Sequence, residues 1–235
     1  MTTTTQPGLQ NQFKDTSIIT DPFIWIKDDV LTSDFCKDII RRFEESDSPD
    51  KLQGTAGYSV NTQIKESLDL HISNKQEWKD VDEVLAETLY QGIVEYIYSL
   101  NQSLDLAKFN PKLLDFGISV FINNGDYTVF DSGYQIQRTS VGKGYSWHDD
   151  FDLKGMNGED GPRYLTFIWY LNTVDEGWTQ FHNGNQVAPK EGRLLLFPST
   201  WTYIHQGFPP KQTKYIITGW IQQNKVINGQ TINYG

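Results

Sequence analysis

Two histidines and an aspartate in the second half of the chain are the residue types of a metal site. His148 and Asp150 are separated by one residue, and His205 follows between two apolar runs. Two imidazoles and one carboxylate are the ligands of non-haem Fe(II) sites that keep open coordination positions. In an extended strand, residues i and i+2 project from the same face, roughly 7 Å apart, so both can reach one ion. The pattern therefore predicts a metal centre formed by His148, Asp150 and His205.

Other acids and histidines fit this pattern less well. Asp149 projects from the opposite face of the same strand. His182 is the rival third ligand, but it lies in a turn-rich segment (FHNGN), where side chains usually face water. His71 lies before a long helical pattern and is interpreted as structural or exposed.

A cation and two hydroxyl groups belong to strands expected beside this centre. Strand alternation puts Lys214 and Trp220 on one face of residues 214–222. A lysine among apolar residues is costly to bury unless an anion meets it, although it can instead extend to water at a strand end. Thr166 and Tyr170 share one face of their strand and can donate to the same anion or simply pack. The grouping favours an acidic co-substrate beside the metal.

The composition narrows the class of protein. The 235 residues include 7 Trp, 12 Tyr and 13 Phe, enough apolar surface for a substantial core. The net charge of −10 repels phosphate backbones, so we expect no nucleic-acid partner. A single cysteine, Cys36, excludes an internal disulfide framework and thiolate zinc sites.

The termini and apolar runs give no targeting signal. The first residues, MTTTTQPGLQNQ, lack the basic and apolar regions of a signal peptide. No apolar run approaches the roughly 18 residues that a bilayer span needs. We therefore expect a soluble, cytoplasmic protein without membrane association, in which residues 1–18 form a flexible polar tail.

The first half of the chain predicts helices with one short strand. Residues 23–26 (FIWI) are typical of a strand, and Thr32 or Ser33 can cap a helix that continues through Phe43. Residues 46–57 read as a polar loop. Apolar residues recur every three to four positions over 76–100, which predicts a longer helix packed on a sheet.

From about residue 113 the texture changes to short β-prone runs separated by Gly, Asn, Asp and Pro. The expected strands cover residues 117–122, 133–138, 164–171, 192–197 and 214–222. Many short strands after helices predict an α+β, mostly β fold with a jelly-roll core. Residues 19–235 are expected to form a single domain, with helical support over about 19–112 and the jelly roll over about 113–222.

Five ordered segments resemble the Fe(II)- and 2-oxoglutarate-dependent dioxygenases, in particular the prolyl 4-hydroxylase-like branch. The first is GKGYSWHDD at 142–150, and RYLTFIWYLN at 163–172 resembles the family's next strand. DEGWTQF at 175–181 resembles the acidic turn after it. GRLLLFPS at 192–199, then His205 and TKYIITGW at 213–220, resemble the closing segment. The resemblance covers about residues 113–222.

This resemblance implies a double-stranded β-helix and a set of site roles. It implies Fe(II) on His148, Asp150 and His205, with O2 as oxidant and ascorbate in support. It implies 2-oxoglutarate held by Lys214 and Thr166, helped by Tyr170. Tyr145 matches a tyrosine that family members often place by the site, and Trp220 matches an aromatic near the substrate, where Arg163 is also expected.

The chain departs from the family at three positions. Thr139 stands where prolyl hydroxylases commonly have Tyr, which bears on co-substrate contacts. The glycine pair of the acidic turn is reduced to Gly177, with Trp178 beside it. The basic residue is Lys214 rather than Arg, as in the collagen-type prolyl hydroxylases.

The leading functional hypothesis is hydroxylation of an unactivated C–H bond, on a peptidyl proline, with release of succinate and CO2. The proline substrate rests on the resemblance alone. A hydroxylase of a small molecule or free amino acid is the second hypothesis, and a jelly-roll binding module without turnover is the third. Loops at 51–67 and 123–132 are candidate covers for a substrate.

Overall fold

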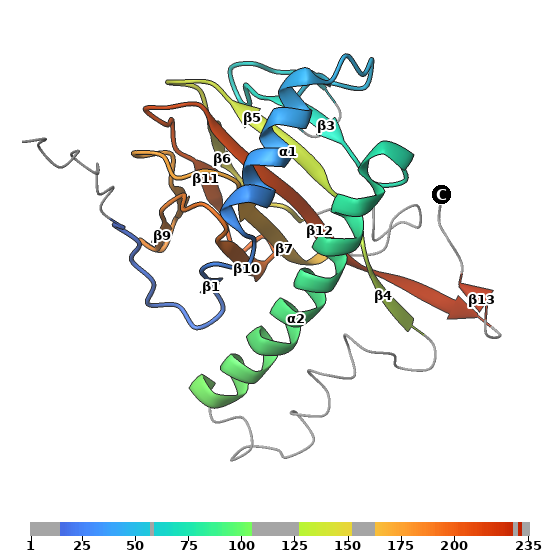
Figure 1. Cartoon of the computed structure of the whole chain (residues 1–235). Coiled ribbons are helices and arrows are strands. Elements are labelled where there is room, and N and C mark those ends of the chain that lie inside the picture. The colour runs from blue at the N-terminus through green and yellow to red at the C-terminus, as the bar shows by residue number, and fades with distance from the viewer. Residues whose placement is uncertain (1–14, 57–58, 105–126, 152–162, 228–229, 232–235) are drawn as a thin grey trace, which may run out of the picture.

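Two antiparallel sheets and two helices make up the described part of the chain. The computed structural model describes residues 15–56, 59–104, 127–151, 163–227 and 230–231. Both helices cross the same face of the larger sheet, with α1 in blue and α2 in green in Figure 1. The arrangement confirms the predicted mostly β fold with helices buttressing a jelly-roll core.

The larger sheet joins strands from both ends of the chain. Its order is β1-β10-β7-β12-β5-β3-β2, and β4 and β13 also pair with β12. The strands are β1 (Trp25–Lys27), β2 (Leu52–Gln53), β3 (Leu68–His71), β4 (Tyr127–Asp131), β5 (Gln135–Thr139), β7 (Arg163–Tyr170), β10 (Leu194–Pro198), β12 (Lys214–Ile227) and β13 (Gln230–Thr231).

The smaller sheet carries the histidines. Its order is β6-β11-β8-β9, from β6 (Tyr145–His148), β8 (Thr179–Phe181), β9 (Gln186–Val187) and β11 (His205–Gly207). Two of its members, β6 and β11, are adjacent although more than fifty residues of sequence separate them. This pairing is what brings the N-terminal and C-terminal parts of the predicted metal site together.

Helix α1 (Ser33–Glu45) begins where the sequence predicted. Thr32 is extended and its hydroxyl accepts a hydrogen bond from the backbone N–H of Phe35 at 3.3 Å, which satisfies one of the free donors of the first turn. The buried face of the helix carries Cys36, Ile39 and Phe43, at the spacing of an amphipathic helix.

Helix α2 (Lys79–Leu104) follows a short 3₁₀ turn, η1 (Gln76–Trp78), and continues four residues beyond the predicted end. Gly92 faces the sheet, and a side-chain carbon added there would lie 2.6 Å from Leu194. The missing side chain lets the helix backbone approach the sheet closely.

Alternation along the central strands produces two cores on opposite faces of the large sheet. On β7, Phe167 and Trp169 pack under the helices, whereas Ile168 and Tyr170 face the smaller sheet. Neighbouring β10 divides its side chains in the same way. Each fully buried large apolar side chain contributes about 1.5–3 kcal/mol to folding. The core between the two sheets therefore places the face of β7 that carries Ile168 and Tyr170 opposite the histidines of the small sheet.

The structure corrects the prediction for the first half in two places. Residues 46–57 were expected to be a loop, but they contain β2, and β3 was not predicted as a strand at all. Both extend the large sheet beyond β5, so the supporting region is not purely helical. Of the predicted covers, residues 127–131 form β4, whereas the predicted strand at 117–122 lies outside the described residues.

Part of the predicted tail is attached to the domain. Residues 15–18 lie within the described ranges, and the backbone of Ile18 exchanges two hydrogen bonds with Gln186 of β9, each of 2.9 Å. Within the described residues, contacts with the domain are therefore already present at Asp15, four residues before the predicted start of the domain. None of the described helices combines the length and the apolar character required to cross a bilayer.

Candidate metal centre

A cavity of about 900 Å³ lies between the two sheets. His148 and His205 line it from the small sheet, and Thr166, Ile168 and Lys214 line it from the large sheet. It continues past the centre along β5 and β12 as far as Ser73 and Asp131. This volume is near the upper end of pockets that hold small molecules, roughly 300–1,000 Å³.

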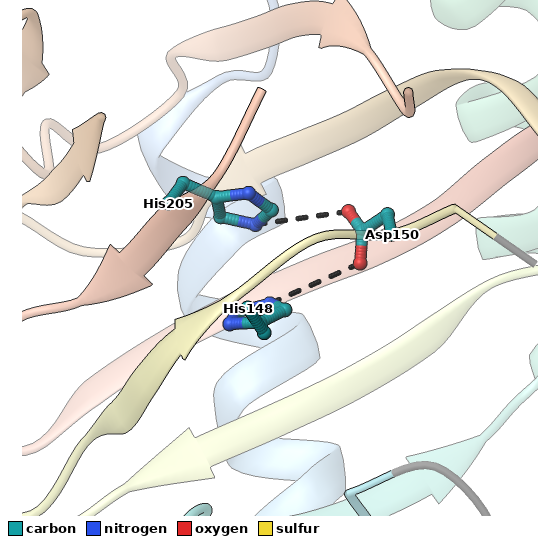
Figure 2. Close-up of side chains that lie close together, drawn as sticks. All are labelled: His148, Asp150 and His205. Carbon is teal, nitrogen blue, oxygen red and sulfur yellow. Dashed lines mark ion pairs between the residues drawn. The ribbon is translucent and has the colours of Figure 1, made fainter. Parts of the chain in front are cut away.

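His148, Asp150 and His205 converge on one point in the wall of this cavity (Figure 2). One ligand atom from each residue lies within 4.8 Å of the other two. The Nε2 atom of His148 lies 3.9 Å from Asp150 Oδ1, and that of His205 lies 3.7 Å from Asp150 Oδ2. The predicted trio is thus brought together, whereas the rival His182 is exposed in the turn after β8.

The convergence follows from the register of the small sheet. His148 is the last residue of β6 and His205 is the first of β11, and the two are direct cross-strand partners. Their ring centroids are 4.2 Å apart. Asp150 follows two residues after the strand end and turns its carboxylate toward both rings, as Figure 2 shows.

Backbone carbonyls fix how each imidazole presents its nitrogens. Nδ1 of His148 lies 2.7 Å from the carbonyl oxygen of Ser146, and Nδ1 of His205 lies 3.0 Å from that of Tyr203. A carbonyl only accepts, so Nδ1 carries the proton in both rings. In the neutral imidazoles, each Nε2 then offers a lone pair toward Asp150, as metal-binding histidines do.

Burial and charge tune these groups toward metal binding. Burial, together with the nearby His205, lowers the pKa of His148 below its usual value, which favours the neutral ring. Burial alone raises the pKa of Asp150, but the two histidines and a hydrogen bond from Thr166 outweigh it and lower the pKa overall. A neutral His148 ring beside an ionised Asp150 carboxylate is the combination that a bound cation requires of these two residues.

The hydroxyl of Thr166 contacts the metal-site carboxylate, and its predicted contact with the co-substrate stays a prediction. The sequence assigned its hydroxyl to the co-substrate carboxylate. In the structure, the hydroxyl donates to Asp150 Oδ2 at 2.7 Å and lies 2.9 Å from the hydroxyl of Ser199. The shared face on β7 was predicted correctly, but the metal-site carboxylate is the nearer partner. Thr166 therefore contacts a residue of the candidate centre directly.

Lys214 is buried at the base of the cavity. Its side chain is 5% exposed, and Nζ donates to the carbonyl oxygen of Gly177 at 2.8 Å. Burial lowers the pKa of Lys214 to about 8. Thr139 is the cross-strand partner of Lys214 on β5, and Thr179 and Gly207 line the same end of the cavity. A buried ammonium with so little compensation is a site for an anion.

Tyr170 does not line the Lys214 end of the cavity itself but contacts a residue that does. It is fully buried, and its hydroxyl lies 2.7 Å from that of Thr179. Thr179, rather than Tyr170, lines the cavity. Sequence reasoning missed Thr179, although its alternation with buried Phe181 on β8 is a signal that it faces inward.

Tyr145 lies against the metal centre as the resemblance implied. Its ring stacks on that of His148, with centroids 3.5 Å apart and planes inclined by 13°. Behind it lies a buried ion pair that the sequence did not reveal, in which Lys65 Nζ contacts Asp69 at 2.8 Å. Polar residues recur at every second position here, at Lys65, Ser67, Asp69 and His71. This alternation was the signal in the sequence that could have predicted a strand with a polar face.

Trp220 and Arg163 lie together in the cavity wall away from Lys214. The Arg163 guanidinium lies 3.7 Å from the centroid of the Trp220 ring, and one of its N–H groups donates to the backbone oxygen of Asp150 at 3.4 Å. Both predicted substrate residues therefore line the cavity next to the metal trio.

Comparisons with known proteins agree with this geometry. The sequence profile of the 2OG-Fe(II) oxygenase superfamily matches residues 134–222, which include all three residues of the trio and Lys214. No curated protein matches the sequence significantly.

Three solved structures share the fold. A prolyl hydroxylase from Trichoplax adhaerens, solved with a hypoxia inducible factor peptide fragment, is 19% identical with a TM-score of 0.61, covering 86% of this chain and 84% of its own. A viral collagen prolyl hydroxylase from Paramecium Bursaria Chlorella virus-1, solved with 2OG, is 18% identical with a TM-score of 0.55, and the match covers 87% of this chain and 97% of that one. A Pseudomonas putida prolyl-4-hydroxylase is 19% identical with a TM-score of 0.54, and the match covers 85% of this chain and 92% of that one.

The superfamily match includes the two histidines, the aspartate and the buried lysine of this site, and the three solved structures share the fold of this chain. Over residues 134–222 the chain is similar to the 2OG-Fe(II) oxygenase superfamily, and its fold is prolyl 4-hydroxylase-like.

Proposed function

We propose that this enzyme is a hydroxylase in which His148, Asp150 and His205 bind Fe(II). The observation that carries the proposal is the convergence of their three ligand atoms within 4.8 Å in a cavity wall. Both Nε2 atoms already face the carboxylate, so the rings need no rearrangement to bind a metal. Iron(II), 2-oxoglutarate and O2 would together supply the oxidising power that inserts one oxygen atom into a C–H bond, releasing succinate and CO2.

The far carboxylate of 2-oxoglutarate is proposed to bind Lys214. One of the three N–H groups of the ammonium donates to Gly177, and among the described residues no acceptor is seen for the other two, which are left for an anion. The hydroxyl of Thr179 lies at the same end of the cavity, held by Tyr170. Thr139 beside Lys214 is smaller than the Tyr of related enzymes and leaves room for the carboxylate.

The proposed substrate is a peptidyl proline. The cavity extends past the trio, along the stacked Trp220 and Arg163 side chains and along β5, so it offers more length than 2-oxoglutarate fills. The three relatives are named prolyl hydroxylases, and one was solved with a peptide. An extended peptide crossing the metal centre would place one side chain toward the iron.

A free amino acid is the second candidate, favoured by the Lys65–Asp69 pair. The side chains of both residues are 7% exposed, and Lys65 lines the cavity. Neighbouring positive and negative charges complement the carboxylate and ammonium of a zwitterion, whereas a peptide bond has neither charge. A binding module without turnover is less well supported, because the trio lines an open cavity.

Mass spectrometry and succinate release test these alternatives together. The protein is incubated with Fe(II), ascorbate and 2-oxoglutarate, and then with a proline-peptide library or with free amino acids. A gain of one oxygen on a peptide supports the first candidate, and a gain on a free amino acid supports the second. Absence of succinate, with no 2-oxoglutarate binding by calorimetry, would exclude both. His148→Ala is the matched inactive control.

A further inference from the structure

Residues 15–20, which we call the N-terminal strap, are built into the edge of the small sheet. Ile18 pairs with Gln186 of β9 through two backbone hydrogen bonds, and the Gln186 side chain donates to the carbonyl of Thr16 at 2.8 Å. The Ser17 hydroxyl accepts from the backbone N–H of Ala188 at 2.9 Å. The strap therefore adds one β-bridge, at Ile18, to the edge strand β9 and is held beside it by side-chain hydrogen bonds.

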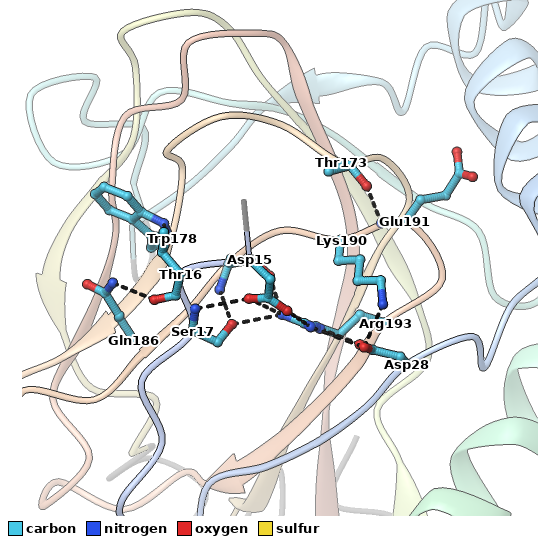
Figure 3. Close-up of polar contacts among 11 residues, drawn as sticks. Asp15, Thr16, Ser17, Asp28, Thr173, Trp178, Gln186, Lys190, Glu191 and Arg193 are labelled. Carbon is cyan, nitrogen blue, oxygen red and sulfur yellow. Dashed lines mark hydrogen bonds and ion pairs between the residues drawn. The ribbon is translucent and has the colours of Figure 1, made fainter. Parts of the chain in front are cut away.

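Arg193 fixes the start of the strap to the domain (Figure 3). Its side chain is 1% exposed and pairs with Asp15 of the strap and, at 2.6 Å, with Asp28. It also donates to the Ser17 hydroxyl at 2.8 Å. Because the guanidinium is planar and makes several hydrogen bonds, it holds the strap in one position rather than merely near the surface.

The strap contacts the turn that faces Lys214. The indole N–H of Trp178 donates to the Thr16 hydroxyl at 3.0 Å, as Figure 3 shows. The Trp178 ring packs on Phe208 with centroids 5.1 Å apart, and the Trp178 carbonyl accepts from the Phe208 N–H at 2.9 Å. Trp178 is thus held from the side of the strap and from the side of β11.

Gly177 transmits this position to the cation. It directly precedes Trp178, and its carbonyl accepts the 2.8 Å hydrogen bond from Lys214 Nζ. Its φ of +71° is one that glycine adopts without strain, and an added side-chain carbon would lie 2.9 Å from Pro210 and 3.4 Å from Lys214. A turn packed this closely has little room to move independently of Trp178.

We propose that Trp178 and Thr16 are positioning residues for the co-substrate cation. The strap holds the indole, the indole holds the turn, and the Gly177 carbonyl holds the Lys214 ammonium where a carboxylate meets it. The inference gives a role to the tryptophan that stands where related enzymes have a second glycine. It rests on the proposed binding of 2-oxoglutarate by Lys214.

Removing only the hydrogen bond between strap and turn tests this inference. Trp178→Phe keeps a ring and removes the donor, and Thr16→Val keeps the shape and removes the acceptor. Loss of one such bond should weaken 2-oxoglutarate binding about three- to tenfold. The readouts are the dissociation constant by calorimetry on full-length Mn(II)-loaded protein and the KM for 2-oxoglutarate. Metal affinity and melting temperature are measured alongside.

A double variant and two matched single variants sharpen the test. Because both substitutions remove the same bond, the Trp178→Phe/Thr16→Val double variant should bind no more weakly than either single variant. Thr16→Ser keeps the hydroxyl that accepts from Trp178, so this variant should bind 2-oxoglutarate as tightly as the wild type does. Thr20→Val changes a strap residue that contacts Asn185 instead, and it should bind 2-oxoglutarate as the wild type does.

The possible failures are distinguishable. If the wild-type protein neither binds nor consumes 2-oxoglutarate, the proposed function fails and this inference fails with it. If the wild type binds it and both single variants bind equally tightly, the inference alone is overturned. A general loss of melting temperature and metal affinity in step with 2-oxoglutarate affinity would also overturn it, because a structural defect would then explain the result.

Discussion

The metal centre and the Arg193 cluster are two acid-containing networks that solve the burial of charge in different ways. At Arg193, two carboxylates meet a fixed guanidinium, and hydrogen bonds from Arg193 lower the pKa of both Asp15 and Asp28. At the metal centre, the contacts recorded for the Asp150 carboxylate in the described residues are a hydroxyl and two imidazoles. The first network is complete within the chain, and the second is arranged to receive a cation.

The difference separates structural charge from functional charge. A completed ion pair gives the strap a fixed place, whereas an acid facing two imidazole lone pairs keeps a position for a ligand. Lys214 is also a functional charge in this sense, but a positive one. Within the described residues, its buried ammonium has only the neutral carbonyl of Gly177 as a partner. An acid and a base, each lacking a full counter-charge, lie in one cavity, where a metal ion and an anion would supply both.

The largest expected effect is on activity at Asp150. Asp150→Asn keeps the shape of the side chain and removes the charge, so Fe(II) binding and turnover should fall by more than about a hundredfold, because even outer partners of a metal site are worth 10–100-fold. The stability of the metal-free protein should change by less than about 1 kcal/mol, since among the described residues the Asp150 carboxylate contacts a hydroxyl and two imidazoles and no lysine or arginine. Metal titration and urea unfolding measure the two quantities.

The Arg193 cluster should behave in the opposite way. Arg193→Met removes the only cation recorded beside Asp15 among the described residues and one of the two beside Asp28, and should cost about 2–4 kcal/mol, somewhat less than breaking a fully buried pair because both acids are partly exposed. Lys190 also pairs with Asp28, but its side chain is 39% exposed, so Lys190→Met should cost less than about 1 kcal/mol. Equal losses in the two variants would contradict the central role of buried Arg193 in this cluster, and an Arg193→Met loss no larger than that of Asp150→Asn would contradict the difference between the two networks.

At the anion end, Lys214→Met should weaken 2-oxoglutarate binding about 10–100-fold while Fe(II) still binds. The pKa of about 8 adds a pH dependence. The free protein loses the ammonium as the pH rises through 8, and the anion binds the charged form, so wild-type affinity should fall by up to about tenfold for each unit above pH 8. Calorimetry across this range checks the slope, which Lys214→Met should abolish.

Features of the structure that depend on the alternation of side chains along a strand, or on a helix cap, could mostly be predicted from the sequence. The spacing of His148 and Asp150, the faces of β7 and the cap at Thr32 each follow from a local rule. The partner of the Thr166 hydroxyl does not, because a shared face identifies the side of the sheet and not the nearest atom. Strand β3 was missed because its inward face is polar, and the strap because its anchor, Arg193, lies far along the chain.

The smallest expected effect distinguishes the sequence-based role of Thr166 from its structural one. Thr166→Val keeps the volume of the side chain and removes the 2.7 Å hydrogen bond to Asp150. If the hydroxyl orients the metal ligand, Fe(II) affinity should fall about tenfold and 2-oxoglutarate affinity should stay the same. If it binds the co-substrate, as the resemblance implied, the reverse should hold. Thr179→Val is the matched comparison, because that hydroxyl lies at the Lys214 end and its loss should affect 2-oxoglutarate alone.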